Sequence, residues 1–150
     1  LYEIQNIATF VACVGFSIIF NIHGPGIMIC ALGGTITWAV YCAAIYFNLD
    51  LFTAYFIAAV VAAIYSEALA RIRKYPAISY LVIAIFPLIP GAGIYYTTSH
   101  LVRGDTEAFS PKALETIGIA GVIAVGILMV STIVRLTNVW KQRHNKKASE

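Results

Sequence analysis

The sequence predicts an all-α, polytopic membrane protein with five transmembrane helices, on three observations. Hydrophobic residues make up 60% of the 150 residues and charged residues only 11%, whereas soluble domains have roughly 45–50% and about 25%. Several apolar runs approach or exceed the roughly 20 residues that a helix needs to cross a bilayer. These runs are continuous and do not alternate with polar residues, which favours helices over the strands of a β-barrel.

Short polar or breaker-rich segments separate the five predicted spans. The spans cover residues 4–20, 27–47, 51–70, 77–102 and 113–136. The turn Asn21–Gly26 follows the first span and the link Asn48–Asp50 follows the second. The basic segment Arg71–Pro76 closes the third span, and we expect residues 103–112 to form the longest loop.

Lys and Arg are concentrated on one side of the predicted membrane. In this topology eight lie on the side of the carboxyl terminus and only Arg103 and Lys112 on the other. Because loops rich in Lys and Arg stay cytoplasmic, we predict an amino terminus outside and a cytoplasmic carboxyl terminus. Residues 1–140 then form a single five-helix domain. Residues 141–150 form a basic tail, which we expect to bind anionic membrane lipid and no nucleic acid.

The fourth span contains residues that interrupt a helix. Pro87 and Pro90 have no backbone N–H to donate, and Gly91 and Gly93 permit unusual dihedral angles. We therefore expect a break at Pro87–Gly93, near mid-depth, after which a half-helix restarts with unpaired N–H groups and the positive end of its dipole in the membrane. Such an end attracts a carboxylate. The alternative interpretation is a proline kink stabilised by neighbouring helices.

Hydroxyl side chains follow the break along the predicted half-helix. Thr98 lies three residues after Tyr95, so the two side chains could share a face with the break and bind substrate. The same hydroxyls could equally bond to carbonyls of their own helix or to neighbouring helices.

Two ionisable side chains are candidates for proton coupling or gating. Glu67 is an acid well within a span, and stripes of Ala and Ser on that helix indicate that it faces the bundle interior. The alternative role of Glu67 is an ion pair with Arg71, four residues later. His100 lies near the outer end of the fourth span. Its two alternative roles are a proton relay and an interfacial hydrogen-bonding group.

No pattern for a metal, a cofactor or catalysis is recognised. Cys13, Cys30 and Cys42 lack CxxC or CxxH spacing, and His23 and His100 fall near opposite membrane faces. The sequence has no GxSxG or HExxH motif. We expect neither a metal nor a cofactor, and we expect that the protein is not an enzyme.

Four segments carry a resemblance to a known family. "FSIIFN" ends the first span, "SEALARIRKYPA" closes the third, and "PLIPGAGIYY" is followed by "LVRGD". Together they resemble the carboxyl-terminal half of the threonine/serine exporter family, in order and over nearly the whole chain. The family has "PGGG" where this chain has Pro90–Gly93 with Ala92 in third place.

The resemblance implies a function and a partner. In that family this half also occurs as a separate small membrane subunit, paired with a larger membrane subunit that carries the other half. It implies export of small amino acids or short dicarboxylates, of the threonine, serine and succinate class, by proton antiport across a bacterial cell membrane. Matching the family motif, the site candidates carried over are Pro87, Pro90, Gly91, Gly93 and Tyr95, with Glu67 as the acid. The alternative is a structural or assembly subunit that does not itself contact the carboxylate-bearing substrate.

Overall fold

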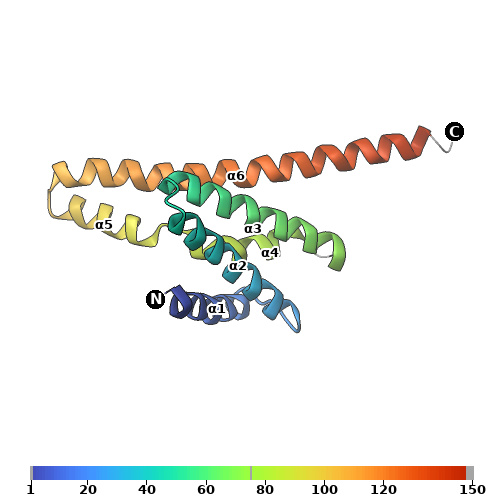
Figure 1. Ribbon diagram of the computed structural model, residues 1–150, viewed down its shortest axis with the longest axis horizontal. Coiled ribbons are helices and arrows are strands. Elements are labelled where there is room, and N and C mark those ends of the chain that lie inside the picture. The colour runs from blue at the N-terminus through green and yellow to red at the C-terminus, as the bar shows by residue number, and fades with distance from the viewer. Residues whose placement is uncertain (1, 75, 148–150) are drawn as a thin grey trace.

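The protein is all-α, as predicted, in the part of the chain that the computed structural model describes, residues 2–74 and 76–147. Side chains are described for residues 3–74 and 76–140. The elements in chain order are α1 (Tyr2–Ile19), α2 (Gly26–Tyr46), α3 (Leu51–Arg73), α4 (Ala77–Ile85), the 3-10 helix η1 (Phe86–Leu88), α5 (Gly91–Val102) and α6 (Thr106–Lys147). Figure 1 shows their arrangement.

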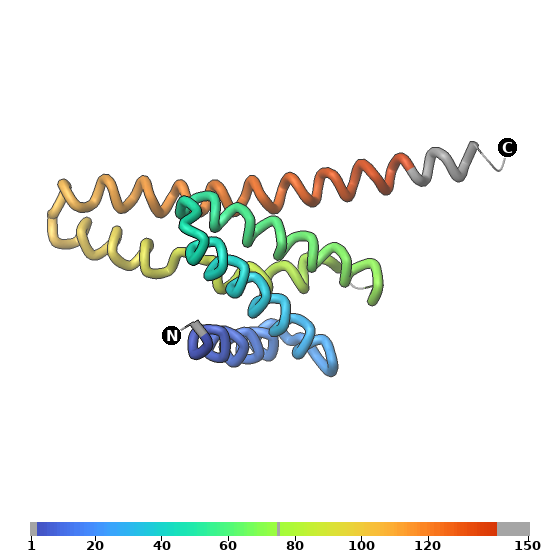
Figure 2. Tube along the Cα trace, viewed as in Figure 1, coloured from blue at the N-terminus to red at the C-terminus, as the bar shows by residue number. Residues whose placement is uncertain are grey.

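The helices form a layered bundle along one long helix. α1 packs on α2, α2 on α3, and α4 lies against both α2 and α3. The long helix α6 packs against α5 along its first part and against α3 farther along, and it continues beyond the end of α3 (Figure 2). The break between α4 and α5 therefore lies beside α6.

Small side chains allow α3 to approach its neighbours closely. Ala54, Ala58, Ala62 and Ser66 recur every four residues and are 0–1% exposed, which confirms the predicted packing stripe. On α6, a Cβ added at Gly126 would lie 3.2 Å from the Cβ of α3 residue Ala59. The α3–α6 interface thus depends on the absence of larger side chains.

Five spans are not confirmed. Three helices of the described chain are long and apolar enough to cross a membrane: Gly26–Tyr46, Leu51–Arg73 and Thr106–Trp140. The bent pair Ala77–Leu88 and Gly91–Val102 makes a fourth when it is counted as one span, whereas Glu3–Ile19 is shorter. The orientation of the termini stays a prediction.

The loop predicted at residues 103–112 is wrong in its extent. α6 already begins at Thr106, because the Asp105 carboxylate caps it by accepting the N–H of Ala108 at 3.1 Å. Pro111 lies inside the helix, where its missing N–H affects a turn close to the helix start. The connection is only residues 103–105.

α6 is longer than a membrane requires. It has 42 residues and at about 1.5 Å per residue measures roughly 63 Å, about twice a hydrocarbon core. It continues through residues 141–147, the first part of the predicted basic tail. The side chains of that tail and residues 148–150 lie outside the described part, so its interaction with lipid stays a prediction.

Candidate functional site

The fourth predicted span is broken where the sequence predicts it. α4 ends at Ile85, the 3-10 turn η1 covers Phe86–Leu88, and α5 begins at Gly91. The two arms are bent by 57°. Pro87 lies within η1 and Pro90 immediately precedes α5.

The 3-10 turn supplies new partners for the carbonyls that the prolines leave unpaired. The Ile83 carbonyl, which Pro87 cannot serve, accepts the N–H of Phe86 and lies 4.0 Å from the Sγ of Cys13. The Phe86 carbonyl, which Pro90 cannot serve, accepts the N–H of Ile89 at 3.2 Å. Both carbonyls therefore have backbone partners despite the two prolines.

The start of α5 retains unpaired donors, as the prolines and glycines predict. The N–H of Gly91 donates to the Ile89 carbonyl at 2.7 Å, and the N–H of Ile94 donates to the Pro90 carbonyl at 3.0 Å. Among the described residues, no backbone carbonyl accepts from the N–H groups of Ala92 and Gly93. These two amides form the positive end of the half-helix.

A groove of about 420 Å³ lies beside the break, and its walls are apolar. Its lining residues come from α4, α5, α6 and the break: Ile85, Ile89, Pro90, Ile94, Thr116, Ile117, Ala120 and Ile123. Thr116 contributes the only hydroxyl of that lining and donates it to the Lys112 carbonyl at 2.7 Å. In this single chain the groove therefore offers a substrate few side-chain donors.

Gly91 and Gly93, both predicted site residues, have different surroundings. A Cβ at Gly93 would lie 2.6 Å from the Oγ1 of Thr116, whereas a Cβ at Gly91 would have no atom within 4 Å. Gly93 is thus a packing contact between α5 and α6. Gly91 borders open space next to the break.

Tyr95 and Thr98 do not line the groove beside the break. They border a separate hollow of about 240 Å³, together with Ser99, Val102 and Arg103. The Thr98 hydroxyl donates to the Ile94 carbonyl at 2.9 Å, which is the alternative that the sequence left open. Tyr95 and Thr98 thus border a common hollow that is separate from the groove beside the break, and a substrate-binding role for them stays a prediction.

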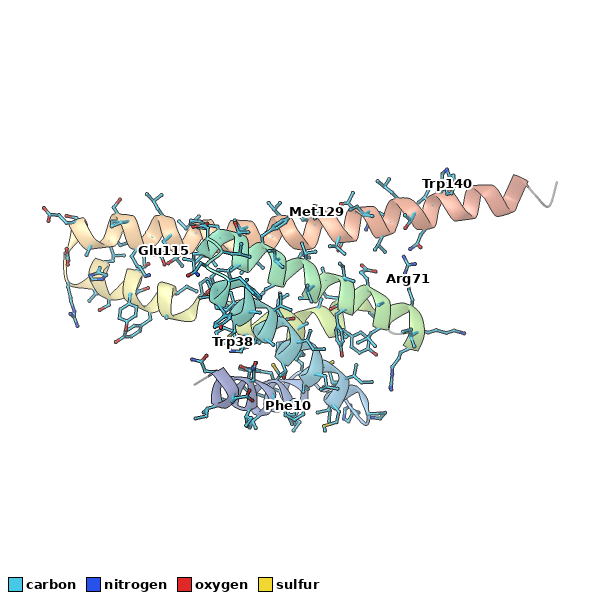
Figure 3. All side chains as sticks on the ribbon, viewed as in Figure 1. Phe10, Trp38, Arg71, Glu115, Met129 and Trp140 are labelled. Atoms are coloured by element: carbon cyan, nitrogen blue, oxygen red, sulfur yellow. The ribbon has the colours of Figure 1, made fainter. Side chains whose placement is uncertain are left out.

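Glu67 does not pair with Arg71. The Arg71 guanidinium instead donates to the Oδ1 of Asn138 on α6 at 3.1 Å (Figure 3), and no ion pair joins Arg71 to Glu67. Glu67 is half-buried in a groove of about 440 Å³ between α3, α4 and α6, which Arg135 also lines. A proton-coupling role for Glu67 stays a prediction.

His100 contacts the connection between α5 and α6. Its Nδ1 lies 3.4 Å from the Oδ2 of Asp105, and the Asp105 N–H donates to the His100 carbonyl at 3.0 Å. These contacts match the interfacial hydrogen-bonding alternative, because they join His100 to the cap of α6.

The sequence did not indicate the roles of three polar residues on the first turns of α6: Thr116, which lines the groove beside the break, and the pair Lys112 and Glu115. The Nζ of Lys112 donates to the Oε1 of Glu115 at 2.9 Å, and Thr116 contacts Gly93. The spacing of three residues between Lys112 and Glu115 is the signal that predicts their pairing. Nothing in the sequence alone indicates that Thr116 faces Gly93, since that contact depends on how α5 and α6 dock.

These features define a multi-pass helical membrane protein in which a bent break joins two apolar helices, and many secondary transporters contain such broken helices. Residues 5–133 match the profile of the family described as Threonine/Serine exporter, ThrE, so the chain belongs to this family. The match confirms the resemblance carried by the sequence segments. Searches of curated proteins and of solved structures found no match. The chain is therefore a transport protein of the threonine/serine exporter type.

Proposed function

We propose that the chain is the small membrane subunit of a two-component exporter in a bacterial plasma membrane. The exported solutes are small amino acids or short dicarboxylates, of the threonine, serine and succinate class, and protons move in the opposite direction. The observation that carries this proposal is the interrupted span, where the amides of Ala92 and Gly93 have no backbone acceptor. A substrate carboxylate at this position replaces the missing acceptor.

A partner subunit completes the site in this proposal. Ile89, Ile94 and Ile117 beside the break are 48–68% exposed, and the groove next to them has apolar walls. Irregular backbone at membrane depth is stable only where protein or a water-filled cavity covers it. The larger subunit of the exporter, which carries the other half of the transporter, supplies that cover and the remaining polar contacts.

A structural or assembly subunit is the second candidate. The apolar lining of the groove favours it, because such a surface can dock a partner helix without holding solute. The larger subunit then binds the substrate alone. In this case the break shapes an interface, and its unpaired amides are covered by the partner.

The substitution Gly91→Leu separates the two candidates. Because a Cβ at Gly91 meets no atom of this chain within 4 Å, the variant should fold, and its side chain should occupy the space next to the break. Co-expression with the larger subunit, size-exclusion chromatography and transport of threonine, serine and succinate in proteoliposomes give the readout. Gly15→Leu on α1 is the matched control, since Gly15 also has open space around it.

An intact complex that no longer transports supports the substrate site. Loss of the complex together with transport supports the assembly role. Normal transport by Gly91→Leu contradicts a substrate site at the break.

A further inference from the structure

A cavity of about 590 Å³ lies away from the break. It lies on the side of the bundle where Figure 1 shows the α1–α2 and α3–α4 connections, away from the α5–α6 connection. The α1–α2 connection, the first turns of α2, the last residue of α3 and the start of α4 supply its lining: Phe20, Asn21, Ile22, His23, Pro25, Gly26, Cys30, Arg73, Ser79 and Tyr80. Its volume lies within the roughly 300–1,000 Å³ of small-molecule sites.

The described lining of the cavity carries positive charge and no acidic side chain. The Arg73 guanidinium is permanently charged, and the imidazole of His23 adds a donor or, when protonated, a second charge. None of the lining residues is Asp or Glu. Among the described residues, the contacts between carboxylates and basic side chains are Lys112–Glu115 and His100–Asp105, so no described carboxylate neutralises Arg73.

The charged and imidazole side chains lie at the solvent-exposed side of the cavity, and buried side chains line its inner side. Cys30 and Tyr80 in the lining are 1% and 4% exposed, while His23 and Arg73 are exposed. The α1–α2 turn is held in place, because the Ile22 N–H donates to the Ser17 carbonyl at 2.9 Å and Asn21 adopts a left-handed φ of 59°. The backbone of this turn therefore positions His23, whereas Arg73 is carried by the last turn of α3 and Ser79 by the first turn of α4.

We propose that this cavity binds an anionic oxygen group, a carboxylate or a phosphate, with Arg73 as its principal ligand. A guanidinium donates two parallel hydrogen bonds to either group, and His23 and Ser79 are the further donors. The proposal does not depend on substrate binding at the break. In the predicted orientation the cavity opens on the cytoplasmic face, where soluble carboxylates and lipid phosphates are both available.

Binding to the purified full chain tests the proposal. In nanodiscs of phosphatidylcholine, calorimetric titration with succinate and with inorganic phosphate measures soluble anions. In detergent, native mass spectrometry compares retention of phosphatidylglycerol with retention of phosphatidylcholine. Arg73→Gln should weaken binding roughly 10-fold to 100-fold, as expected for loss of hydrogen bonds to a charged group. Arg71→Gln is the matched control, because it removes the same charge from the same helix but its guanidinium contacts Asn138.

The results of these experiments either identify the source of the anion or overturn the proposal. A calorimetric signal that Arg73→Gln loses and Arg71→Gln keeps supports a soluble anion. Retention of phosphatidylglycerol alone, with the same dependence on Arg73, supports a lipid phosphate. His23→Gln, in an exposed turn, should weaken the same binding if Arg73→Gln proves unstable. Absence of binding in both arms, or equal weakening by Arg71→Gln and Arg73→Gln, overturns the proposal.

Discussion

Glu67 carries its carboxylate on α3, a helix that is long and apolar enough to cross a membrane. It has no ion pair with Arg71 and lies half-buried in a groove that Arg135 also lines. An intramembrane carboxylate without a fixed partner can bind and release a proton during transport, whereas a Gln side chain cannot. We predict that Glu67→Gln abolishes export driven by a pH gradient and leaves the subunit complex intact.

Proteoliposomes with an imposed pH gradient measure this effect, with substrate counterflow as the companion assay. Counterflow needs no net proton movement, so it should persist in the Glu67→Gln protein. Glu107→Gln in the first turn of α6 is the control for loss of a negative charge. If the Glu67→Gln protein exports substrate at the normal rate under a pH gradient, the proton-coupling role is contradicted.

Gly93 fixes the distance between α5 and α6. A Cβ there would lie 2.6 Å from the Thr116 hydroxyl oxygen, and moving that hydroxyl breaks its bond to the Lys112 carbonyl. We predict that Gly93→Ala destabilises the protein by about 1–3 kcal/mol, as overpacking commonly does. The same change at Gly91 should have little effect, because a Cβ there has open space. Thermal unfolding in detergent compares the two variants.

A second substitution tests whether the Thr116 contact is the cause. Thr116→Ala removes the two nearest atoms and leaves only the Cβ, 3.4 Å from the added methyl. The double variant Gly93→Ala/Thr116→Ala should therefore recover part of the stability lost by Gly93→Ala. If the two substitutions are simply additive, the proposed clash is not the reason for the loss.

At the scale of elements, the break between α4 and α5 depends on two missing N–H donors. Alanine at positions 87 and 90 would restore donors for the carbonyls of Ile83 and Phe86. We predict that Pro87→Ala/Pro90→Ala reduces the bend. Full straightening of the 57° bend, at about 1.5 Å per residue, lengthens the separation of the arm ends by about 4 Å.

Electron paramagnetic resonance distances between spin labels at Ile78 and Val102 measure this change. Both side chains are well exposed, at 62% and 81%, so labels should not disturb the packing. Pro111→Ala is the control, since Pro111 already lies within a continuous helix. A distance unchanged by the double substitution would assign the bend to packing against α6 and not to the prolines.

The α4–α5 break and the start of α6 show which structural features can be predicted from sequence and which cannot. The break was predictable because the missing N–H is a property of Pro87 and Pro90 themselves. The start of α6 was not predictable, because the Asp105 carboxylate caps the helix before Pro111 and the helix continues through that proline. The sequence also did not predict that Tyr95 and Thr98 border a hollow separate from the groove beside the break. A spacing of three residues indicates a shared helix face but does not say what that face meets.

At the scale of the whole molecule, the side of the membrane on which the chain begins depends on α1. Its apolar part, Glu3–Ile19, measures about 26 Å at 1.5 Å per residue, a few ångströms less than a typical hydrocarbon core. A short helix can still span where the bilayer thins locally or flanking residues reach the interface. The uneven distribution of Lys and Arg places the α1–α2 turn and the α3–α4 turn inside, so a spanning α1 puts the amino-terminal side of this helix outside.

We therefore predict that Glu3 and Arg103 are outside and that His23 is inside. Cysteine substituted at each position should be tested in intact cells with a membrane-impermeant maleimide. The native Cys13, Cys30 and Cys42 are buried and should give a low background. Labelling at Glu3→Cys and Arg103→Cys in intact cells, and at His23→Cys only after permeabilisation, is the expected pattern. If Glu3→Cys also labels only after permeabilisation, α1 lies on one side and the chain has four spans, because an even number returns both ends to the cytoplasm.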